Sequence, residues 1–440
     1  MKKLKYGHYI HGGIQLTVGF GIVHLLSRWI TGNTILSSPE SLIKYGITGG
    51  IGYSLMGAFA LILFGFVAKY VRKHYPNLET IGDILREKLN PRGYWYMIGL
   101  LLFTSLDSMF VQAMGAAILF HMIFPVPLSI TLLFFFAFCF ILSGLGGMIR
   151  MHQLAGLHVT LIFATAIILP VYFFIQEGVL PIYQGIKLYH PYLLYYKNYD
   201  SIYFIVTAAL IGFGQVLIDR ATWQRLYMFK KERVQLTFTL SGIIWATIPI
   251  ALSSMLMIAI FSGSFDDKQA LLYLLIHKIN SSFLFILFIL FCISALTSTL
   301  NAELHSTSVL VVKNIIKEIF PKTTVRKLLL YSYSVNALFC IGLFMIVMIL
   351  SPTLLELLFF FGGIYASIIT PMLVILYSKG KVSSVIPFFS LFGLITSFLF
   401  KVQIGSLSSI WLSFSISTIL CLFYVLTKKI KKNKPTEIFS

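Results

Sequence analysis

Runs of apolar residues long enough to cross a lipid bilayer constrain this chain more than any other feature of its sequence. One of them, "FLFILFILFCI", covers residues 283–293 without a charged side chain, and similar runs recur along the whole chain. Hydrophobic residues make up 58% of the sequence and charged residues only 11%, against about 25% charged residues in soluble domains. Because the hydrocarbon core offers no water to the backbone, a spanning run of about 20 apolar residues must satisfy its peptide groups internally, as an α-helix.

Twelve such runs predict an all-α polytopic membrane protein with about 12 transmembrane helices. The loops between the runs are short, and we expect no soluble domain. The predicted spans lie near residues 14–42, 46–69, 94–123, 126–147, 154–176, 201–218, 236–262, 281–313, 328–350, 353–378, 383–400 and 405–427.

Membrane topology explains the strongly basic balance, a formal net charge of +19. Most of the 34 Lys and Arg residues fall on alternate loops and on the two ends, including "MKKLK" and "KKIKKNK". Basic segments stay on the cytoplasmic side during insertion. We therefore expect a multi-pass protein of the cell membrane with both termini in the cytoplasm, surrounded by the lipid bilayer. The charge requires no nucleic-acid partner.

Two of the predicted spans are interrupted by polar residues, Gly and Pro. The first contains "HLLSRWITGNTILSSPE", with Gly32 and Pro39, and the sixth contains "ALIGFGQVLI", with Gly212 and Gly214 beside Gln215. Gly and Pro are common in membrane helices generally. However, broken helices at corresponding positions of two halves mark the midplane site of secondary transporters. This pattern predicts an inverted five-plus-five repeat with broken helices 1 and 6.

The repeat divides the predicted membrane transport domain, residues 1–427, into parts. Repeat one is expected at about 14–176, repeat two at about 201–378, two extra helices at 383–427 and a basic cytoplasmic tail at 428–440. The external segment "QEGVLPIYQGIKLYHPYLLYYKNYD" is expected to contain a lid or a short surface helix. The amphipathic stretch "NLETIGDILREKLN" is expected to lie along the membrane face or to pack on the bundle as a linker helix.

The charged residues Arg28, Asp107 and Glu303 lie well inside predicted spans, away from their ends. Ionisable residues within a membrane are costly, and they usually face a partner or a cavity. Asp107 in the third span and Glu303 in the eighth stand at matching positions of the two repeats. Each is either a buried, paired acid with a structural role or part of a transport site. Asp107 could also hold an amine or guanidine substrate, or carry a coupling proton.

Small hydroxyl residues form a stripe on the eighth span. In "SALTSTLNAELHSTS", residues 294–308, helical geometry places Ala295, Ser298, Thr299 and Glu303 on one face. Hydroxyl and carbonyl oxygens are ligands that hard cations prefer. Two neighbouring hydroxyls could supply part of a sodium shell, which the carbonyls of a broken helix opposite would complete. The stripe equally suits close helix packing, with the hydroxyls bonded to their own helix.

Three segments resemble the sodium:solute symporter family over roughly residues 14–380. Ala295, Ser298 and Thr299 match the Ala-x-x-Ser-Ser/Thr motif of the family's eighth core helix. "RWITGNTILSSPESLIKYGITG" is similar to the first core helix. "DRATWQRLYMFKKE" is similar to the cytoplasmic loop after core helix six, with Trp-Gln-Arg at residues 223–225. The wording around "SPESLIKYGITG" and "WQRLY" is nearest to the active urea permease branch.

The resemblance implies a leucine-transporter-like fold and a sodium ion as cofactor. It places sodium on the backbone carbonyls of Ser27, Ile30 and Ala295 and on the hydroxyls of Ser298 and Thr299. The substrate would bind beside the helix breaks. The residues implied for it are Thr31, Asn33, Thr34, Asp107, Gly212 and Gln215.

These observations predict a secondary active transporter that imports a small polar solute on the sodium gradient by alternating access. Arg28 flanks the implied ion site. Its guanidinium could replace the ion, which would make the protein a proton-coupled or sodium-independent transporter, or it could pair with Asp107 or Glu303. A non-transporting membrane sensor on the same fold is the alternative of another class, for which the 13 residues after Thr427 leave little room. No nucleotide, metal or nucleophile motif indicates an enzyme.

Overall fold

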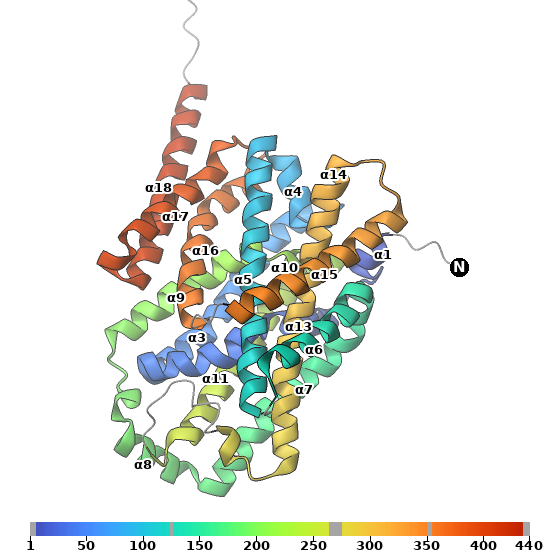
Figure 1. The fold of residues 1–440 in the computed structure, drawn as a ribbon. Helices are drawn as coiled ribbons and strands as arrows, with labels where there is room; N and C mark the ends of the chain where they lie inside the picture. The colour runs from blue at the N-terminus through green and yellow to red at the C-terminus, as the bar shows by residue number, and fades with distance from the viewer. Residues whose placement is uncertain (1–5, 124–125, 264–274, 350–353, 434–440) are drawn as a thin grey trace, which may run out of the picture.

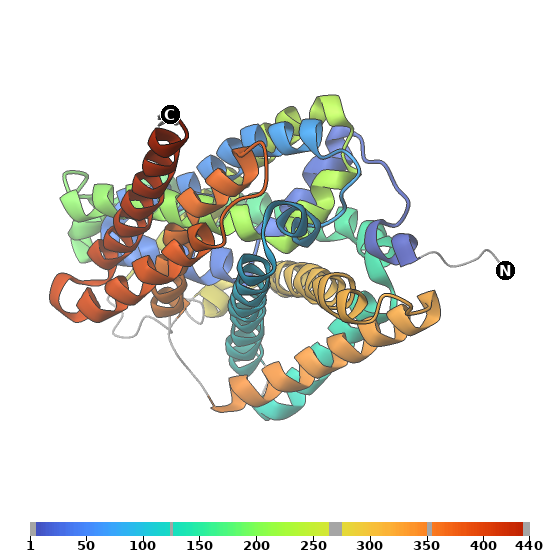
Figure 2. The same cartoon turned by 90° about the horizontal axis from the view of Figure 1, so that it is seen from above.

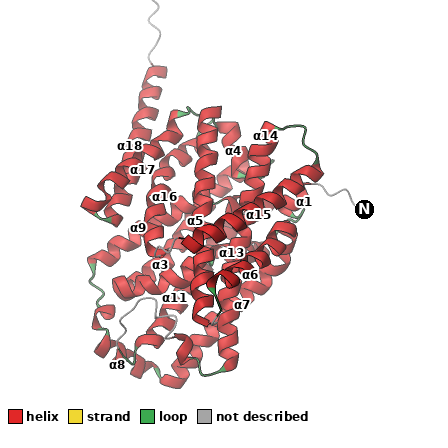
Figure 3. Ribbon diagram, in the orientation of Figure 1, coloured by secondary structure: helices red, strands yellow, loops and turns green. Residues whose placement is uncertain are grey.

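The computed structural model describes residues 6–123, 126–263, 275–349 and 354–433. Within these ranges the backbone is almost entirely helical (Figure 3), and its only extended pairings are two isolated bridges, Leu16–Phe229 and Leu89–Val382. The helices are α1 (Tyr6–His11), α2 (Val18–Trp29), α3 (Gly32–His74), α4 (Ile81–Lys88), α5 (Pro91–Ile123), α6 (Leu128–Cys139), η1 (Phe140–Leu145), α7 (Gly147–Glu177), α8 (Val179–Tyr189), η2 (Pro191–Leu194), α9 (Tyr199–Ile218), α10 (Arg220–Met228), η3 (Lys231–Arg233), α11 (Val234–Ile260), α13 (Ser282–Val311), η4 (Val312–Ile316), α14 (Lys317–Ile319), α15 (Val325–Ile349), α16 (Leu354–Tyr377), α17 (Val385–Ile404) and α18 (Ser406–Asn433).

The twelve predicted spans each have a helical counterpart. Among the described residues, 11 helices are long and apolar enough to cross a membrane. One of them, α3, bends at Gly46, whose φ of 73° favours glycine and where a Cβ would lie 3.0 Å from the carbonyl oxygen of Leu193. The bend divides α3 between the first and second spans, and α2 supplies the rest of the first. The chain is therefore a multi-pass membrane protein.

The helix α13 runs through the interior of the bundle (Figure 1). It packs against α7 and α5, whereas α3 packs mainly along α11 and α9. Every residue from Ser294 to Leu310 is buried. The C-terminal helices α16, α17 and α18 pack on one another at one side of the molecule, opposite the N-terminus (Figure 2). The polar stripe of the eighth span therefore faces other helices on all sides.

Two spans are broken, as predicted for helices 1 and 6. Ile30 and Thr31 are extended between α2 and α3, and the Thr31 hydroxyl caps α3 by accepting from the backbone N–H of Thr34 at 3.2 Å. Asp219 is extended between α9 and α10, and its carboxylate caps α10 by accepting from the backbone N–H of Thr222 at 3.0 Å. After each break a new helix begins, and a side chain caps its N-terminus.

The predicted position of the second break, at Gly212 and Gly214, is wrong, because α9 continues through both. These glycines allow neighbouring helices to approach closely. A Cβ on Gly212 would lie 3.0 Å from the carbonyl oxygen of Met56, and one on Gly214 would lie 1.9 Å from that of Tyr365. The segment after the break, expected as a cytoplasmic loop, is instead the helix α10, which is buried almost throughout.

Both loops expected to carry helices do so. The external segment contains α8, a surface helix with only Ile182 and Ile186 buried. The segment after α3 contains α4, which buries Ile81, Ile84 and Leu85 and contacts α5, α10 and α16. Of the two arrangements considered for this segment, the linker helix packed on the bundle is therefore the observed one.

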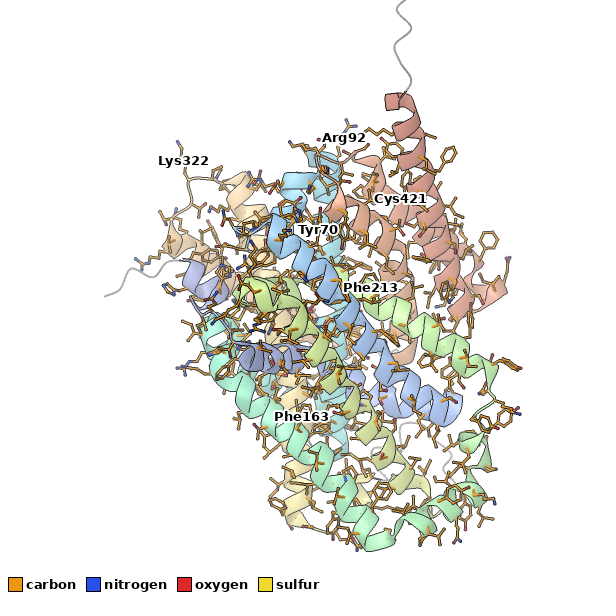
Figure 4. All side chains as sticks on the ribbon, turned by 180° about the vertical axis from the view of Figure 1, so that it is seen from behind. Tyr70, Arg92, Phe163, Phe213, Lys322 and Cys421 are labelled. Atoms are coloured by element: carbon orange, nitrogen blue, oxygen red, sulfur yellow. The ribbon has the colours of Figure 1, made fainter. Side chains whose placement is uncertain are left out.

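An ionic network ties several elements together at the end of the molecule where Arg92 and Lys322 lie and from which α18 extends (Figure 4). Glu79 accepts from His11 at 3.0 Å and from Lys313 at 2.5 Å, and Lys313 also reaches Asp83 at 2.7 Å. The hydrogen bond from His11, with the bond and charge of Lys313, lowers the pKa of Glu79 to about 2. The network joins α1, the loop after α3, α4 and η4.

The Glu79→Gln variant should melt at a lower temperature than the wild type at pH 7, and the difference should shrink in acid. A glutamate titrates at about 4.3 in an unfolded chain, so the contribution of Glu79 is present above that pH and is lost as the pH falls through about 2. Glu79 is 39% exposed, so solvent screening should limit the shift to a few degrees. Melting curves at pH 7, 4 and 2.5 test this. Glu232→Gln, on the exposed η3, is the control, and a pH-independent difference would contradict the prediction.

Candidate functional site

The first break is held in place from three helices. Thr299 on α13 directs its hydroxyl at the carbonyl oxygens of Arg28 and Ile30, at 3.3 and 3.2 Å. Trp245 on α11 donates its indole N–H to the carbonyl oxygen of Trp29 at 2.7 Å. On the other side of the break, the backbone N–H of Gly32 donates to the side-chain oxygen of Gln112 on α5 at 2.7 Å. The backbone groups freed by the break are therefore partnered by side chains, as a buried break requires.

The five residues predicted to hold sodium lie together where the end of α2 faces α13. Ile30 contacts Thr299 as described, the Ser298 hydroxyl lies 3.2 Å from the carbonyl oxygen of Ala295, and Ser27 and Ser298 line the same small pocket. The donor set is three backbone carbonyls and two hydroxyls, all uncharged oxygens. Such oxygens fit a hard monovalent cation, and the hydroxyl protons that now point at carbonyls can rotate away.

The residues predicted for substrate lie in three places, at the start of α3, on α5 and on α9. Thr31 and Thr34 bond to each other at the start of α3, and the Asn33 side chain accepts from Ser37 at 3.3 Å. Asp107 lies on α5, where its carboxylate accepts from the Tyr365 hydroxyl at 2.6 Å. On α9, Gly212 packs against Met56 and Gln215 is half-buried, about one helical turn before the break at Asp219. The first break, rather than Gly212, therefore offers the clustered polar groups.

Four buried charged residues form a cluster between the two breaks. The Arg28 guanidinium donates to Asp219 at 2.7 Å and also to Glu303. Arg220 donates to the second oxygen of Glu303 at 2.8 Å. All four side chains are at most 4% exposed. The predicted pairing of Arg28 with Glu303 is confirmed, whereas its pairing with Asp107 is not formed.

The cluster joins the half-helix before the first break and the half-helix after the second break to the interior helix α13. Arg28 belongs to α2, Asp219 and Arg220 stand at the start of α10, and Glu303 belongs to α13. Arg220 also donates to the carbonyl oxygen of Leu101 on α5, at 2.6 Å. Two cations and two carboxylates satisfy one another, which offsets the cost of taking each charge out of water. In the described residues no cluster of three or more His, Cys, Asp or Glu side chains could hold a metal ion.

Four residues of the site, Asp219, Arg220, Gln112 and Tyr365, were not predicted from the sequence. The length of the predicted sixth span could have indicated Asp219 and Arg220. That span, 201–218, is short for a helix that crosses a bilayer. A break and a polar second half within the membrane would have extended the span to Met228. Gln112 and Tyr365 carry no such signal, because single Gln and Tyr residues are unremarkable in an apolar run.

Two helices broken at matching positions, beside a polar face of a third, define a secondary active transporter of the leucine-transporter fold. Two solved structures share that fold. A Na⁺-coupled sialic acid symporter, in a substrate-bound outward-open state, aligns over 97% of this chain and 93% of its own with a TM-score of 0.78 at 13% identity. Mhp1, a nucleobase-cation-symport-1 family transporter in a closed conformation, aligns over 95% and 94% with a TM-score of 0.57, also at 13% identity.

The chain belongs to the sodium:solute symporter family, whose model matches residues 9–379. A curated relative from Schizosaccharomyces pombe (strain 972 / ATCC 24843), "Probable urea active transporter 1", is 23% identical over 282 residues, which are 58% of this chain and 40% of the relative. The urea-proton symporter DUR3 of Oryza sativa subsp. japonica is 20% identical over 278 residues, 53% of this chain and 36% of the relative. The matched region thus spans less than half the length of these relatives.

Glu303→Gln should destabilise the fold by about 3–5 kcal/mol, because it removes the carboxylate that partners two buried guanidinium groups. Glu318→Gln is the matched control. Its partner Arg86 is 61% exposed, so the loss should be under about 1 kcal/mol. Melting temperatures of both purified variants provide the comparison, and equal losses would show that the cluster does not stabilise the bundle.

Proposed function

We propose that the protein imports a small polar solute coupled to the sodium gradient, by alternating access. The contact of the Thr299 hydroxyl with the carbonyl oxygens of Arg28 and Ile30 is the observation that supports this most directly. It aligns the hydroxyls of α13 with the freed carbonyls of the first break. Membership of the sodium:solute symporter family supports the same proposal.

Sodium would bind to the carbonyl oxygens of Ser27, Ile30 and Ala295 and to the hydroxyls of Ser298 and Thr299. Binding would exchange the hydrogen bonds of Thr299 for ion contacts and would hold α2 against α13. Because solute and ion would both stabilise the form in which the breaks are closed around them, each should tighten the binding of the other.

The solute would bind at the first break, near Thr31, Asn33 and Thr34, and we propose that Asp107 on α5 and Gln215 on α9 also contribute to its site. Hydroxyl, amide and carboxylate groups there suit a small uncharged or cationic solute with several N–H donors. The names of the two curated relatives make urea the first solute to test.

A proton-coupled or sodium-independent cycle is the competing proposal. The position of Arg28 weighs against the version in which its guanidinium fills the ion site, because that group is held by Asp219 and Glu303. Asp107 favours proton coupling, because it is 7% exposed and, among the described residues, no basic side chain lies within ion-pair distance of it.

We also propose that both termini lie in the cytoplasm of a cell-membrane protein, and that the repeats occupy about 14–176 and 201–378. The basic residues near Arg92 and Lys322, at the end from which α18 extends, support this orientation (Figure 4).

Ser298→Ala combined with Thr299→Ala should abolish sodium-stimulated uptake while the protein still folds and inserts. Losing two ligands of a charged ion, at about 1.5–3 kcal/mol each, should weaken sodium binding at least about a hundredfold. Thr297→Ala combined with Ser306→Ala is the matched control, because those hydroxyls bond within α13, to the carbonyl oxygens of Ile293 and Glu303. Unchanged sodium dependence in the first variant would refute the ion site.

Thermal-shift measurements on the purified protein should identify the solute and the coupling ion together. Urea and other small polar solutes are screened in sodium and in choline buffers at several pH values. Sodium coupling predicts that a transported solute raises the melting temperature more in sodium than in choline. A solute effect that depends on pH alone would instead establish the proton-coupled alternative.

A further inference from the structure

A small pocket adjoins the proposed sodium site and is lined by an unusual set of polar groups. Ser27 comes from α2, His158 from α7, Arg225 from α10, and Ser298 and Asn301 from α13, while the remaining lining residues are apolar. None of the lining residues is acidic. Ser27 and Ser298 are shared with the proposed ion site, so the two sites lie next to each other.

Arg225 brings a full positive charge to this pocket without a carboxylate partner. It is 2% exposed, and its guanidinium donates to the carbonyl oxygens of His24 and Ala221 at 3.1 and 3.0 Å. Arg28 and Arg220 each pair with carboxylates, whereas no carboxylate in the described part of the chain lies within ion-pair distance of Arg225. A guanidinium carries five N–H groups, so donors remain to face the pocket. A buried cation left in this state is costly.

Other groups of the lining also lack partners within the described structure. The side-chain oxygen of Asn301 and the Nδ1 of His158 are buried and unbonded. An Asn amide can turn to present its NH₂ group in place of its oxygen, and a neutral imidazole can carry its proton on either nitrogen. Each residue can therefore present an N–H to the pocket, and the two serine hydroxyls can rotate to do the same.

We propose that this pocket binds one small monovalent inorganic anion, of which chloride is the probe, on Arg225 with Asn301, His158 and the two serines as further donors. Charge-assisted bonds from a guanidinium are the strongest that a protein offers such an ion. The small size of the pocket and its apolar walls, which include Leu142 and Leu154, exclude a large organic anion.

The anion would also resolve an electrostatic conflict within the proposed function, and this second step rests on that function. A sodium ion near Ser27 and Ser298 would be repelled by an uncompensated Arg225. An anion between them would neutralise the guanidinium and attract the ion. Chloride and sodium should then tighten the binding of each other.

Chloride binding is tested on the purified full chain with choline as the only cation, so the result does not depend on sodium coupling. Choline chloride should raise the melting temperature in a saturable way, and radiolabelled chloride should bind with one site per chain. Choline gluconate should do neither. Equal effects of chloride and gluconate, without saturable radiolabelled chloride binding, would overturn the proposal.

Variants locate the site. Arg225→Gln should weaken chloride binding at least about tenfold, and Arg233→Gln, on the exposed η3, should leave it unchanged. Since Arg225 also bonds to two carbonyls, its variant could misfold. Asn301→Ala should weaken chloride binding and keep the fold, because the side-chain oxygen of Asn301 has no hydrogen-bond partner among the described residues. Chloride binding that survives Asn301→Ala and a folded Arg225→Gln variant would place the anion elsewhere and refute the site.

Titrations of the purified protein with sodium are a separate experiment. Sodium should bind more weakly in gluconate than in chloride if both proposals hold. Chloride binding in choline without any sodium effect would refute sodium coupling and leave the anion site standing. Sodium binding that is equal in the two salts would refute the coupling between the sites.

Discussion

The requirement that a charge buried among apolar helices be paired governs the centre of this molecule. Arg28, Arg220, Asp219 and Glu303 meet this requirement by pairing with one another across α2, α10 and α13. Replacing such an ion cluster by apolar residues often leaves the free energy of unfolding unchanged. The main effect of the cluster is therefore to fix which elements lie next to one another. Here it fixes the half-helix before the first break and the half-helix after the second break to a single interior helix. That arrangement holds the end of α2 beside the hydroxyls of α13.

The same arrangement determines which groups the hydroxyls of α13 contact. A stripe of Ser and Thr on an isolated helix bonds back to its own carbonyls, and several hydroxyls on α13 do so. Thr299 differs because the end of α2 is held close enough for its hydroxyl to reach two carbonyls of another helix. The proposed ion site therefore differs from a packing surface because its hydroxyls lie close to the carbonyl oxygens of a broken helix.

Much of the fold could be predicted from the sequence because apolar span length and the distribution of basic residues act locally. The twelve spans, the two broken helices and the pairing of Arg28 with Glu303 are confirmed. The second break was misplaced because glycine serves equally for unwinding and for close packing, and only the neighbours of Gly212 and Gly214 distinguish the two uses. Arg220 and Arg225 were assigned to a loop, since charge next to an apolar run normally marks its end. Arg220 bonds to Glu303 and Arg225 bonds to His24, which lie 83 and 201 residues away along the chain.

The contact between α9 and α16 bears on how such a bundle can rock. The carbonyl oxygen of Tyr365 lies where even the methyl group of an alanine at Gly214 could not fit, at 1.9 Å. The Tyr365 side chain meanwhile holds Asp107 on α5. Sliding α9 along α16 would press the Gly214 backbone against that of Tyr365, so we expect these two segments to move together. The bending that releases the solute would then fall at Asp219, where the backbone is extended between α9 and α10.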